Sequence, residues 1–167
     1  NDASAPLILS IGENKREAFA DYKELFQEAA VFIQTGKCLH VKTMSGKVTI
    51  GALNEKATDV LKKVAFTIMP CDLSVTEKMV VIKDNEVKAL ASLEKPTLKL
   101  KVNMLYQAKG ILPASRVNVR LADDLILYLL CVELFAIGVD FIYLAPESLS
   151  ADGLMSFKGE GSTSRGQ

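Results

Sequence analysis

A cysteine and the chain's one histidine stand two residues apart, at Cys38 and His40. Residues 39–43 alternate in the way that is typical of a strand, and with Cys38 at the entry of that strand both side chains should project from the same face. A thiolate and an imidazolium held together can form a nucleophilic pair. Side chains at this spacing are about 6 to 7 Å apart, however, which is too far for a hydrogen bond without bending. We therefore expect Cys38 and His40 to be structural, and we keep a catalytic pair as the alternative.

Two adjacent carboxylates, Asp123 and Asp124, precede a long apolar segment. Paired carboxylates can hold a hard cation such as Mg²⁺ when a third oxygen ligand is present. Acidic side chains at a helix N-terminus also cap the helix and complement its dipole. The capping interpretation is favoured, so we expect no metal site. One histidine is also too few for the common His-rich zinc sites.

The third feature that could have a chemical function is a basic run from Lys95 to Ala122. It contains no acidic residue, although the whole chain has a net charge of zero. Such side chains can neutralise phosphates and bind RNA or another polyanion without reading its sequence. The alternative is a solvated strand face whose lysines discourage pairing between sheet edges. The candidate nucleic-acid-binding residues are Lys95, Lys99, Lys101, Lys109, Arg116 and Arg120.

Common catalytic and cofactor motifs do not occur. Ser45-Gly46-Lys47 resembles the end of a phosphate-binding loop, but Val41 stands where the first glycine is needed and Val48 replaces the serine or threonine. Neither GxGxxG nor GxSxG is present. We therefore expect no cofactor, and an enzyme is less favoured than a binding or structural protein.

The elements that must position these residues follow from periodicity, caps and turns. Asn14 and Glu17 predict the start of an amphipathic helix, and the alternation of Leu98, Leu100 and Val102 with lysines predicts a strand with a basic outer side. The expected helices are 15–35, a short one after Asn54, and 121–137; the expected strands are 65–69, 98–102 and 139–144, with a loop followed by a short strand within 113–119; the expected hairpins are 39–50 and 79–93.

Length and composition predict one domain. With 167 residues, 49% hydrophobic and 24% charged, the chain fits a single α+β domain over 1–158, followed by a Gly- and Ser-rich tail at 159–167. We expect a mixed or antiparallel sheet with an N-terminal amphipathic helix and a buried C-terminal helix. Three widely spaced cysteines favour a reducing, intracellular compartment, and no apolar run is long enough to span a membrane.

Scarce catalytic residues and opposed charged segments favour a non-enzymatic structural protein that self-associates and binds or packages RNA, of the coat or nucleocapsid type, with a virion as one possible location. The tail is a candidate docking arm for such an assembly. Two alternatives remain open. One is a small enzyme that uses the Cys/His pair or the paired aspartates, and the other is an adaptor or ligand-binding module that uses the apolar segment 125–137.

Overall fold

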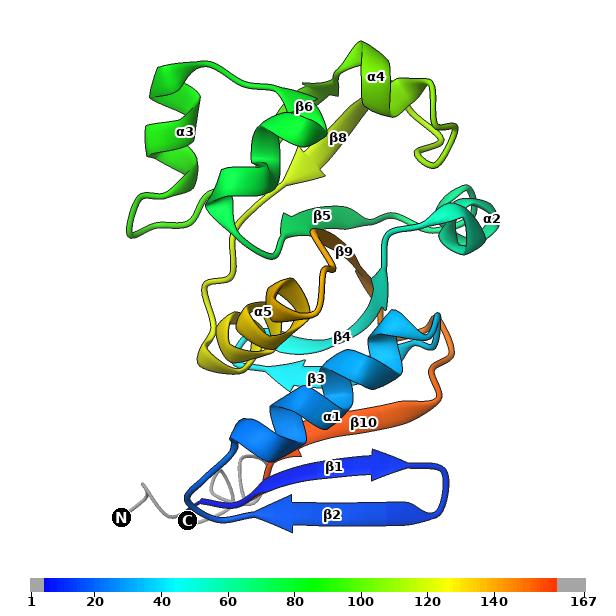
Figure 1. Ribbon diagram of the computed structural model, residues 1–167, viewed down its shortest axis with the longest axis vertical. Helices are drawn as coiled ribbons and strands as arrows, with labels where there is room; N and C mark the ends of the chain where they lie inside the picture. Colours follow the sequence, from blue (N-terminus) through cyan, green and yellow to red (C-terminus); the bar gives the residue numbers. More distant parts are fainter. Residues whose placement is uncertain (1–4, 159–167) are drawn as a thin grey trace.

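The computed structural model describes residues 5–158, which form a large mixed sheet with helices packed on both faces (Figure 1). The strand order is β2-β1-β10-β3-β4-β9-β5-β8-β7-β6. Neighbouring strands are antiparallel except that β10 is parallel to β3 and β5 is parallel to β8. The expected α+β class and the mixed sheet are therefore confirmed.

The elements follow one another along the chain without a regular βαβ rhythm. The strands are β1 Leu7–Ile11, β2 Asn14–Ala18, β3 Leu39–Thr43, β4 Gly46–Ala52, β5 Thr67–Pro70, β6 Val80–Val81, β7 Leu98–Val102, β8 Arg116–Val119, β9 Phe141–Pro146 and β10 Gly153–Phe157. The helices are α1 Lys23–Gln34, α2 Thr58–Leu61, α3 Asp84–Leu90, α4 Met104–Gln107 and α5 Leu125–Ala136, with 3-10 turns η2 Glu55–Ala57 and η3 Leu73–Lys78.

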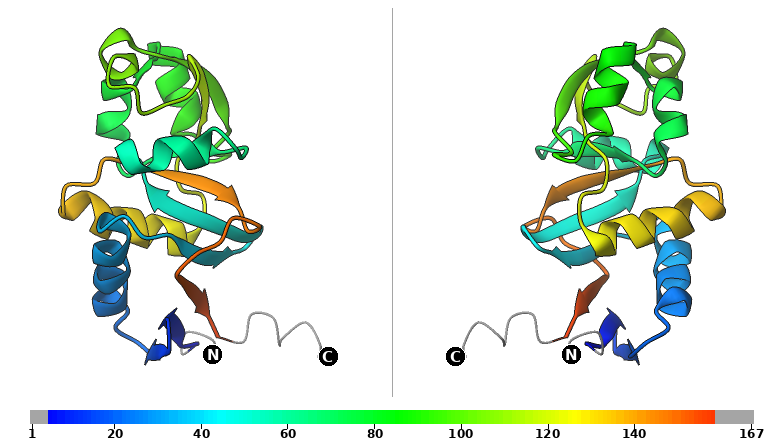
Figure 2. Two further views of the ribbon diagram at one scale, coloured as in Figure 1. Left: turned by 90° about the vertical axis from the view of Figure 1, so that its right-hand side faces the viewer. Right: turned by 90° about the vertical axis from the view of Figure 1, so that its left-hand side faces the viewer.

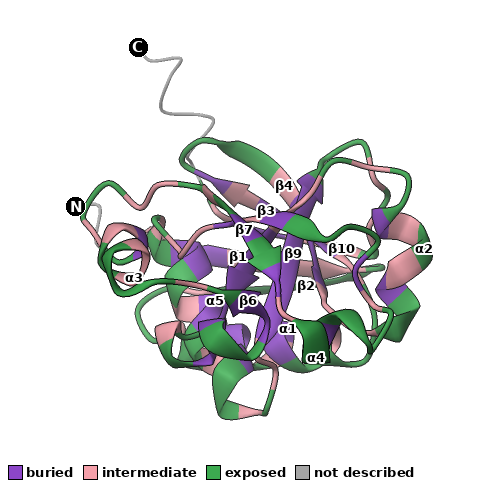
Figure 3. Ribbon diagram, turned by 90° about the horizontal axis from the view of Figure 1, so that it is seen from above, coloured by how far each residue is buried: buried purple, intermediate pink, exposed green. Residues whose placement is uncertain are grey.

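Strand β9 lies at the centre of the sheet and contributes to two apolar cores, one on each face. Ile142 and Leu144 pack into the first core, whereas Phe141 and Tyr143 pack into the second, because successive side chains of a strand point to opposite faces. Helices α1 and α5 cover the first core, and α3 and α4 contribute to the second. Figure 2 shows these groups of helices at different heights of the molecule, and Figure 3 shows the buried interior between them.

The two cores do not cover the sheet evenly. Strands β7 and β8 contribute side chains to the second core alone. The first face of the sheet is therefore left without an apolar cover where these two strands lie. The polar side chains of β7 and β8 project from this uncovered part.

The N-terminal helix predicted for 15–35 is only partly correct. Residues 14–18 form strand β2, which pairs with β1 across a turn in which Gly12 has a φ of +60°. Helix α1 begins at Lys23, and Leu25, Phe26 and Ile33 on its apolar face are buried as expected. The capping role assigned to Asn14 and Glu17 is wrong, because both residues belong to the strand. Pairing with β1 overrides the helical preference of this segment.

The hairpin predicted over 79–93 is also wrong. Residues 84–90 form helix α3, and only the two residues of β6 are extended in the first half of the segment. The Asp84-Asn85 pair was interpreted as a turn, but the carboxylate of Glu86 accepts a hydrogen bond from the Lys83 backbone N–H at 2.9 Å. This contact satisfies a free donor at a helix start.

Helix α5 is apolar except for Glu133 and is buried on one side. Ile126, Leu130 and Leu134 lie in the first core. Four large apolar side chains remain exposed on its other side and are called the exposed α5 stripe: Leu125, Tyr128, Val132 and Phe135. None of the described helices is long and apolar enough to cross a membrane.

Candidate functional site

Strands β7 and β8 bring distant parts of the basic run side by side. In their antiparallel register Lys99 lies opposite Asn118, and Lys101 lies opposite Arg116. The alternate residues Leu100 and Val117 are buried in the second core. The polar residues therefore project from the uncovered first face, and the three cations among them are exposed. We define the basic sheet face as Lys99, Lys101, Arg116, Asn118 and Arg120.

The positive charges of the basic sheet face are largely uncompensated. Within residues 5–158, Lys99, Lys101 and Arg116 form no salt bridge. Like charges directly opposite one another on a sheet are destabilising. A bound anion would relieve the repulsion between Lys101 and Arg116, so this arrangement is suited to holding an anionic group.

Arg120 lies at the inner end of the basic sheet face. Its backbone N–H donates to the carbonyl of Ile68 at 3.1 Å, which continues the pairing of β8 with β5. Its guanidinium donates to Asp123 Oδ1 at 2.8 Å, and the side chain is 18% exposed. A guanidinium has five N–H donors, so several remain for a ligand while Asp123 fixes its position.

A hollow of about 290 Å³ opens beside Arg120. It lies over β4, β9, β5 and β8 and is called the β8 hollow. Thr67, Asn118 and Arg120 supply polar groups, whereas Phe66 and Leu144 are among its apolar wall residues. The remaining wall residues are Val48, Ala65, Ala145 and Pro146. The hollow thus joins a charged surface to a partly apolar recess.

The other two candidates of the basic run lie elsewhere. Lys95 has a φ of 46°, and its ammonium donates to the carbonyl of Ala91 at 3.4 Å. Lys109 follows α4, where its ammonium lies 4.9 Å from the centre of the Tyr106 ring. The structure therefore brings together Lys99, Lys101, Arg116 and Arg120 but leaves Lys95 and Lys109 apart from them.

Thr67 and Asn118 were not among the candidates from the sequence. For Asn118 a signal is present, because residues 116–120 alternate between polar and apolar, which places Arg116, Asn118 and Arg120 on one side of a strand. Thr67 carries no comparable signal. Its place beside Arg120 depends on the pairing of β5 with β8, which is non-local.

Cys38 and His40 each contact another residue and not one another. The Cys38 thiol lies 3.1 Å from the Tyr143 hydroxyl, and His40 Nε2 lies 2.9 Å from the carbonyl of Leu149. Burial raises the pKa of the Tyr143 phenol, and its hydrogen bond with Cys38 raises it further. No hydrogen bond joins Cys38 to His40 in the described part of the chain. The His40 contact holds loop 147–152 against the sheet, whereas the Cys38 thiol contacts strand β9, and a structural role remains our prediction.

The paired aspartates also have separate partners. Asp123 binds Arg120, as described above, whereas Asp124 accepts hydrogen bonds from the backbone N–H groups of Ile126 at 2.9 Å and Met44 at 2.8 Å. Asp124 is thus the cap of α5 and also fastens the β3–β4 turn. Residues 5–158 contain no cluster of three or more His, Cys, Asp or Glu side chains that could hold a metal ion.

Comparison with known proteins identifies solved structures that share the fold of this chain. No protein-family model matches the sequence, and no curated protein matches it. Among solved structures, T. kodakarensis HypF matches with a TM-score of 0.71 and 16% identity, over 90% of this chain and 23% of that chain. A full-length HypF in its phosphate- and nucleotide-bound form matches with a TM-score of 0.59 and 25% identity, over 72% of this chain and 20% of that chain. P. abyssi Sua5 complexed with L-threonine matches with a TM-score of 0.57 and 19% identity, over 74% of this chain and 38% of that chain.

The chain therefore shares a fold with parts of HypF and Sua5 and spans about a quarter or less of the HypF chains. This likeness overturns the coat or nucleocapsid interpretation and its virion location, because these neighbours are proteins of cellular organisms and not capsid subunits. The earlier interpretation was wrong because scarce catalytic residues and mixed charge are not specific to coat proteins. The tail at 159–167, the expected docking arm, lies outside the described residues.

Proposed function

We propose that this domain binds a nucleotide, with the phosphates on the basic sheet face and the rest of the molecule directed into the β8 hollow. The observation that carries the proposal is the placement of Lys101 opposite Arg116, with Lys99 on the same face. Three cations without carboxylate partners in the described part of the chain favour a ligand with several negative charges.

The shape of the site supports a nucleotide over a free phosphate. A guanidinium presents paired donors that match phosphate oxygens, and Arg120 is held in place for such a contact by Asp123. The β8 hollow is close to the lower limit of about 300 Å³ for small-molecule sites, so a nucleotide would fill it only in part. The rest of the nucleotide would extend over the exposed side chains of Lys99 and Lys101. One HypF structure of this fold was determined with phosphate and nucleotide bound, which supports the ligand class.

Calorimetric titration with ATP and with adenosine tests the proposal. We expect ATP to bind and adenosine to bind far more weakly, because the phosphates supply the charge. Arg120→Lys should weaken ATP binding by about ten-fold or more, since lysine keeps the charge but loses the paired donors. Lys88→Gln on α3 removes one exposed positive charge away from the site and should leave the affinity unchanged. Equal binding of ATP and adenosine would contradict the proposal.

Two narrower expectations about partners remain predictions: association of the chain with copies of itself, and binding of RNA or another polyanion. Competition separates RNA from the nucleotide proposal. If ATP displaces a short single-stranded RNA and Lys101→Gln weakens both, the two ligands use the basic sheet face. If RNA binds with full affinity in the presence of saturating ATP, it uses a different surface.

A further inference from the structure

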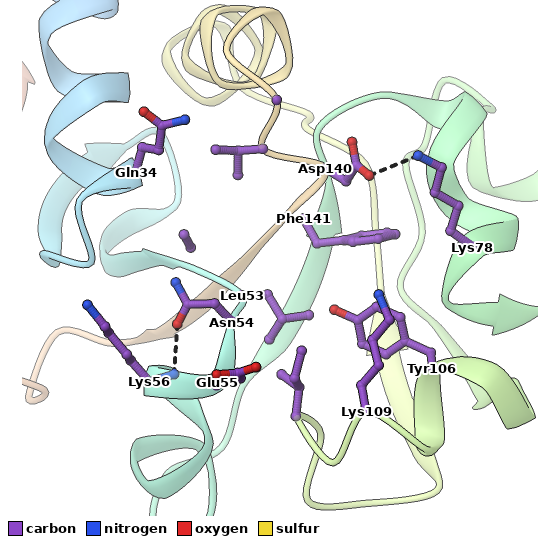
Figure 4. Close-up of a pocket in the computed structure, with 14 residues that line it drawn as sticks. Gln34, Leu53, Asn54, Glu55, Lys56, Lys78, Tyr106, Lys109, Asp140 and Phe141 are labelled. Atoms are coloured by element: carbon purple, nitrogen blue, oxygen red, sulfur yellow. Dashed lines mark hydrogen bonds and ion pairs between the residues drawn. The ribbon is translucent and has the colours of Figure 1, made fainter.

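A second cavity is separate from the basic sheet face and from the β8 hollow. It has a volume of about 510 Å³ and lies between the end of α1, η2, η3, α4 and the segment that leads into β9 (Figure 4). We call it the α4 cavity. The residues that matter here are Lys56, Lys78, Tyr106, Lys109, Asp140 and Phe141. None of them belongs to the nucleotide site proposed above.

Tyr106 supplies a free hydroxyl to this cavity. The residue is only 6% exposed, and its ring packs edge-to-face against Phe141 with the ring centres 5.9 Å apart. Figure 4 shows its phenol oxygen directed into the cavity. The backbone N–H of Tyr106 donates to Asn103, whereas its phenol oxygen forms no hydrogen bond within the described residues and is not among their fully buried unpaired atoms, so it can be reached from the cavity. An accessible hydroxyl without a protein partner can exchange a hydrogen bond with a ligand atom in the cavity.

The charges around the cavity favour an anion. Asp140 is already paired with Lys78 at 3.0 Å. Lys56 and Lys109 form no salt bridge within residues 5–158, and Glu55 is the other carboxylate of the lining. The lining of the cavity contains three lysines and two carboxylates, so its net charge is +1. The Lys109 ammonium lies 4.9 Å from the centre of the Tyr106 ring, so one anionic group could contact both the ammonium and the phenol hydroxyl.

The rest of the cavity is suited to an uncharged body. Leu53, Ile111 and Phe141 form apolar parts of its wall. A volume of about 510 Å³ lies within the usual range for small organic ligands and is far larger than an inorganic anion requires. We propose that the α4 cavity binds a small organic monoanion, with its carboxylate or phosphate group between Tyr106 and Lys109 and its apolar body against Phe141. This site does not depend on the proposed nucleotide function.

Three matched probes test the proposal on the full chain. Benzoate has the anionic group and the apolar body, acetate lacks the body, and benzyl alcohol lacks the charge. We expect benzoate to bind more tightly than both and to shift the backbone amide signals of Tyr106, Lys109 and Phe141 in a proton–nitrogen NMR titration. ATP at saturation should leave these shifts in place, because it occupies the other site.

Two pairs of variants distinguish the site from general effects of charge. Tyr106→Phe removes one hydroxyl and should weaken benzoate binding by about ten-fold, the loss expected for a hydrogen bond to a charged group. Tyr128→Phe removes an exposed hydroxyl on α5 and should have no effect. Lys109→Gln should also weaken binding, whereas Lys88→Gln should not. The proposal is overturned if benzoate leaves the cavity signals unshifted at millimolar concentration, or if Tyr106→Phe and Lys109→Gln both bind it as tightly as the native chain.

Discussion

Replacing Lys101 by glutamine should stabilise the free protein and weaken its binding of ATP. Lys101 faces Arg116 across the β7–β8 pair and has Lys99 two residues away on the same face. For charged ends about 7 Å apart, each repulsion is about 0.6 kcal/mol in water. Removing both interactions should therefore raise the free energy of unfolding by about 1 kcal/mol at low ionic strength. For a domain of this size, such a gain raises Tm by about 2–4 °C.

Thermal unfolding with and without ATP measures both effects. Without ligand, we expect Lys101→Gln to melt above the native chain at low salt. This difference should shrink at about 1 M salt, where the screening length falls to about 3 Å. With ATP the order should reverse, because the native chain binds more tightly and a ligand stabilises the folded state that it binds.

Lys88→Gln is the control for Lys101→Gln. Lys88→Gln changes the net charge by the same amount but has no cation opposite it on a paired strand, and Lys88 lies in the last turn of α3, so this variant should not melt above the native chain at any salt concentration. If Lys101→Gln gains as much stability in high salt as in low salt, repulsion is not the cause. A lower Tm at low salt, or an unchanged effect of ATP, would refute the reasoning.

Three further perturbations test the packing of the domain, and one tests the cysteine. Gly51→Ala should destabilise the fold by about 1–3 kcal/mol in urea denaturation, because the added carbon would lie 2.5 Å from Cζ of Tyr143; Tyr143→Leu should reduce this penalty when the two changes are combined. Asp124→Ala should cost about 1–2 kcal/mol by the same assay, since it removes the cap of α5, and a cost below the error of the measurement would contradict that role. Burial, with a smaller contribution from Asp140, raises the pKa of Tyr106 to about 12, above the usual value near 10, so the unfolded chain ionises first and stability should fall as the pH rises from about 10 towards 12. Tyr106→Phe should remove that part of the pH dependence. Cys38→Ser should leave ATP affinity unchanged, and rapid alkylation of Cys38 near pH 6 with loss of binding would instead support a reactive thiolate.

Local patterns predicted several elements correctly. The alternation around the Ser45-Gly46 turn gave the β3–β4 hairpin, and the lysines of β7 were placed on an exposed face. Asp124 was expected at the start of a helix and caps α5. In these cases the signal and the structure depend on residues that are close in sequence, so a pattern of a few residues was sufficient.

The failures depend on contacts between distant residues. Residues 14–18 have helical preferences, and their extended form depends on pairing with β1, which itself pairs with β10 near the other end of the described chain. The basic sheet face also depends on contacts between distant residues. Alternation in β7 predicts Lys99 and Lys101, but only the register with β8 shows that Arg116 lies opposite Lys101. The α4 cavity brings together five separate segments, and the sequence contains no local signal for it.

The place of β10 in the sheet has a consequence for how the chain folds during synthesis. β10 lies between β1 and β3, with Leu7 opposite Phe157 and Met155 beside Val41. The first hairpin, β1–β2, therefore joins the sheet only through the last described strand. A ribosome must complete almost the whole domain before that hairpin has its partner, and closing so long a loop makes this step slow. Until then the apolar side chains of β1 depend on α1 for cover, and a nascent chain that stalls before residue 153 should expose them to chaperones.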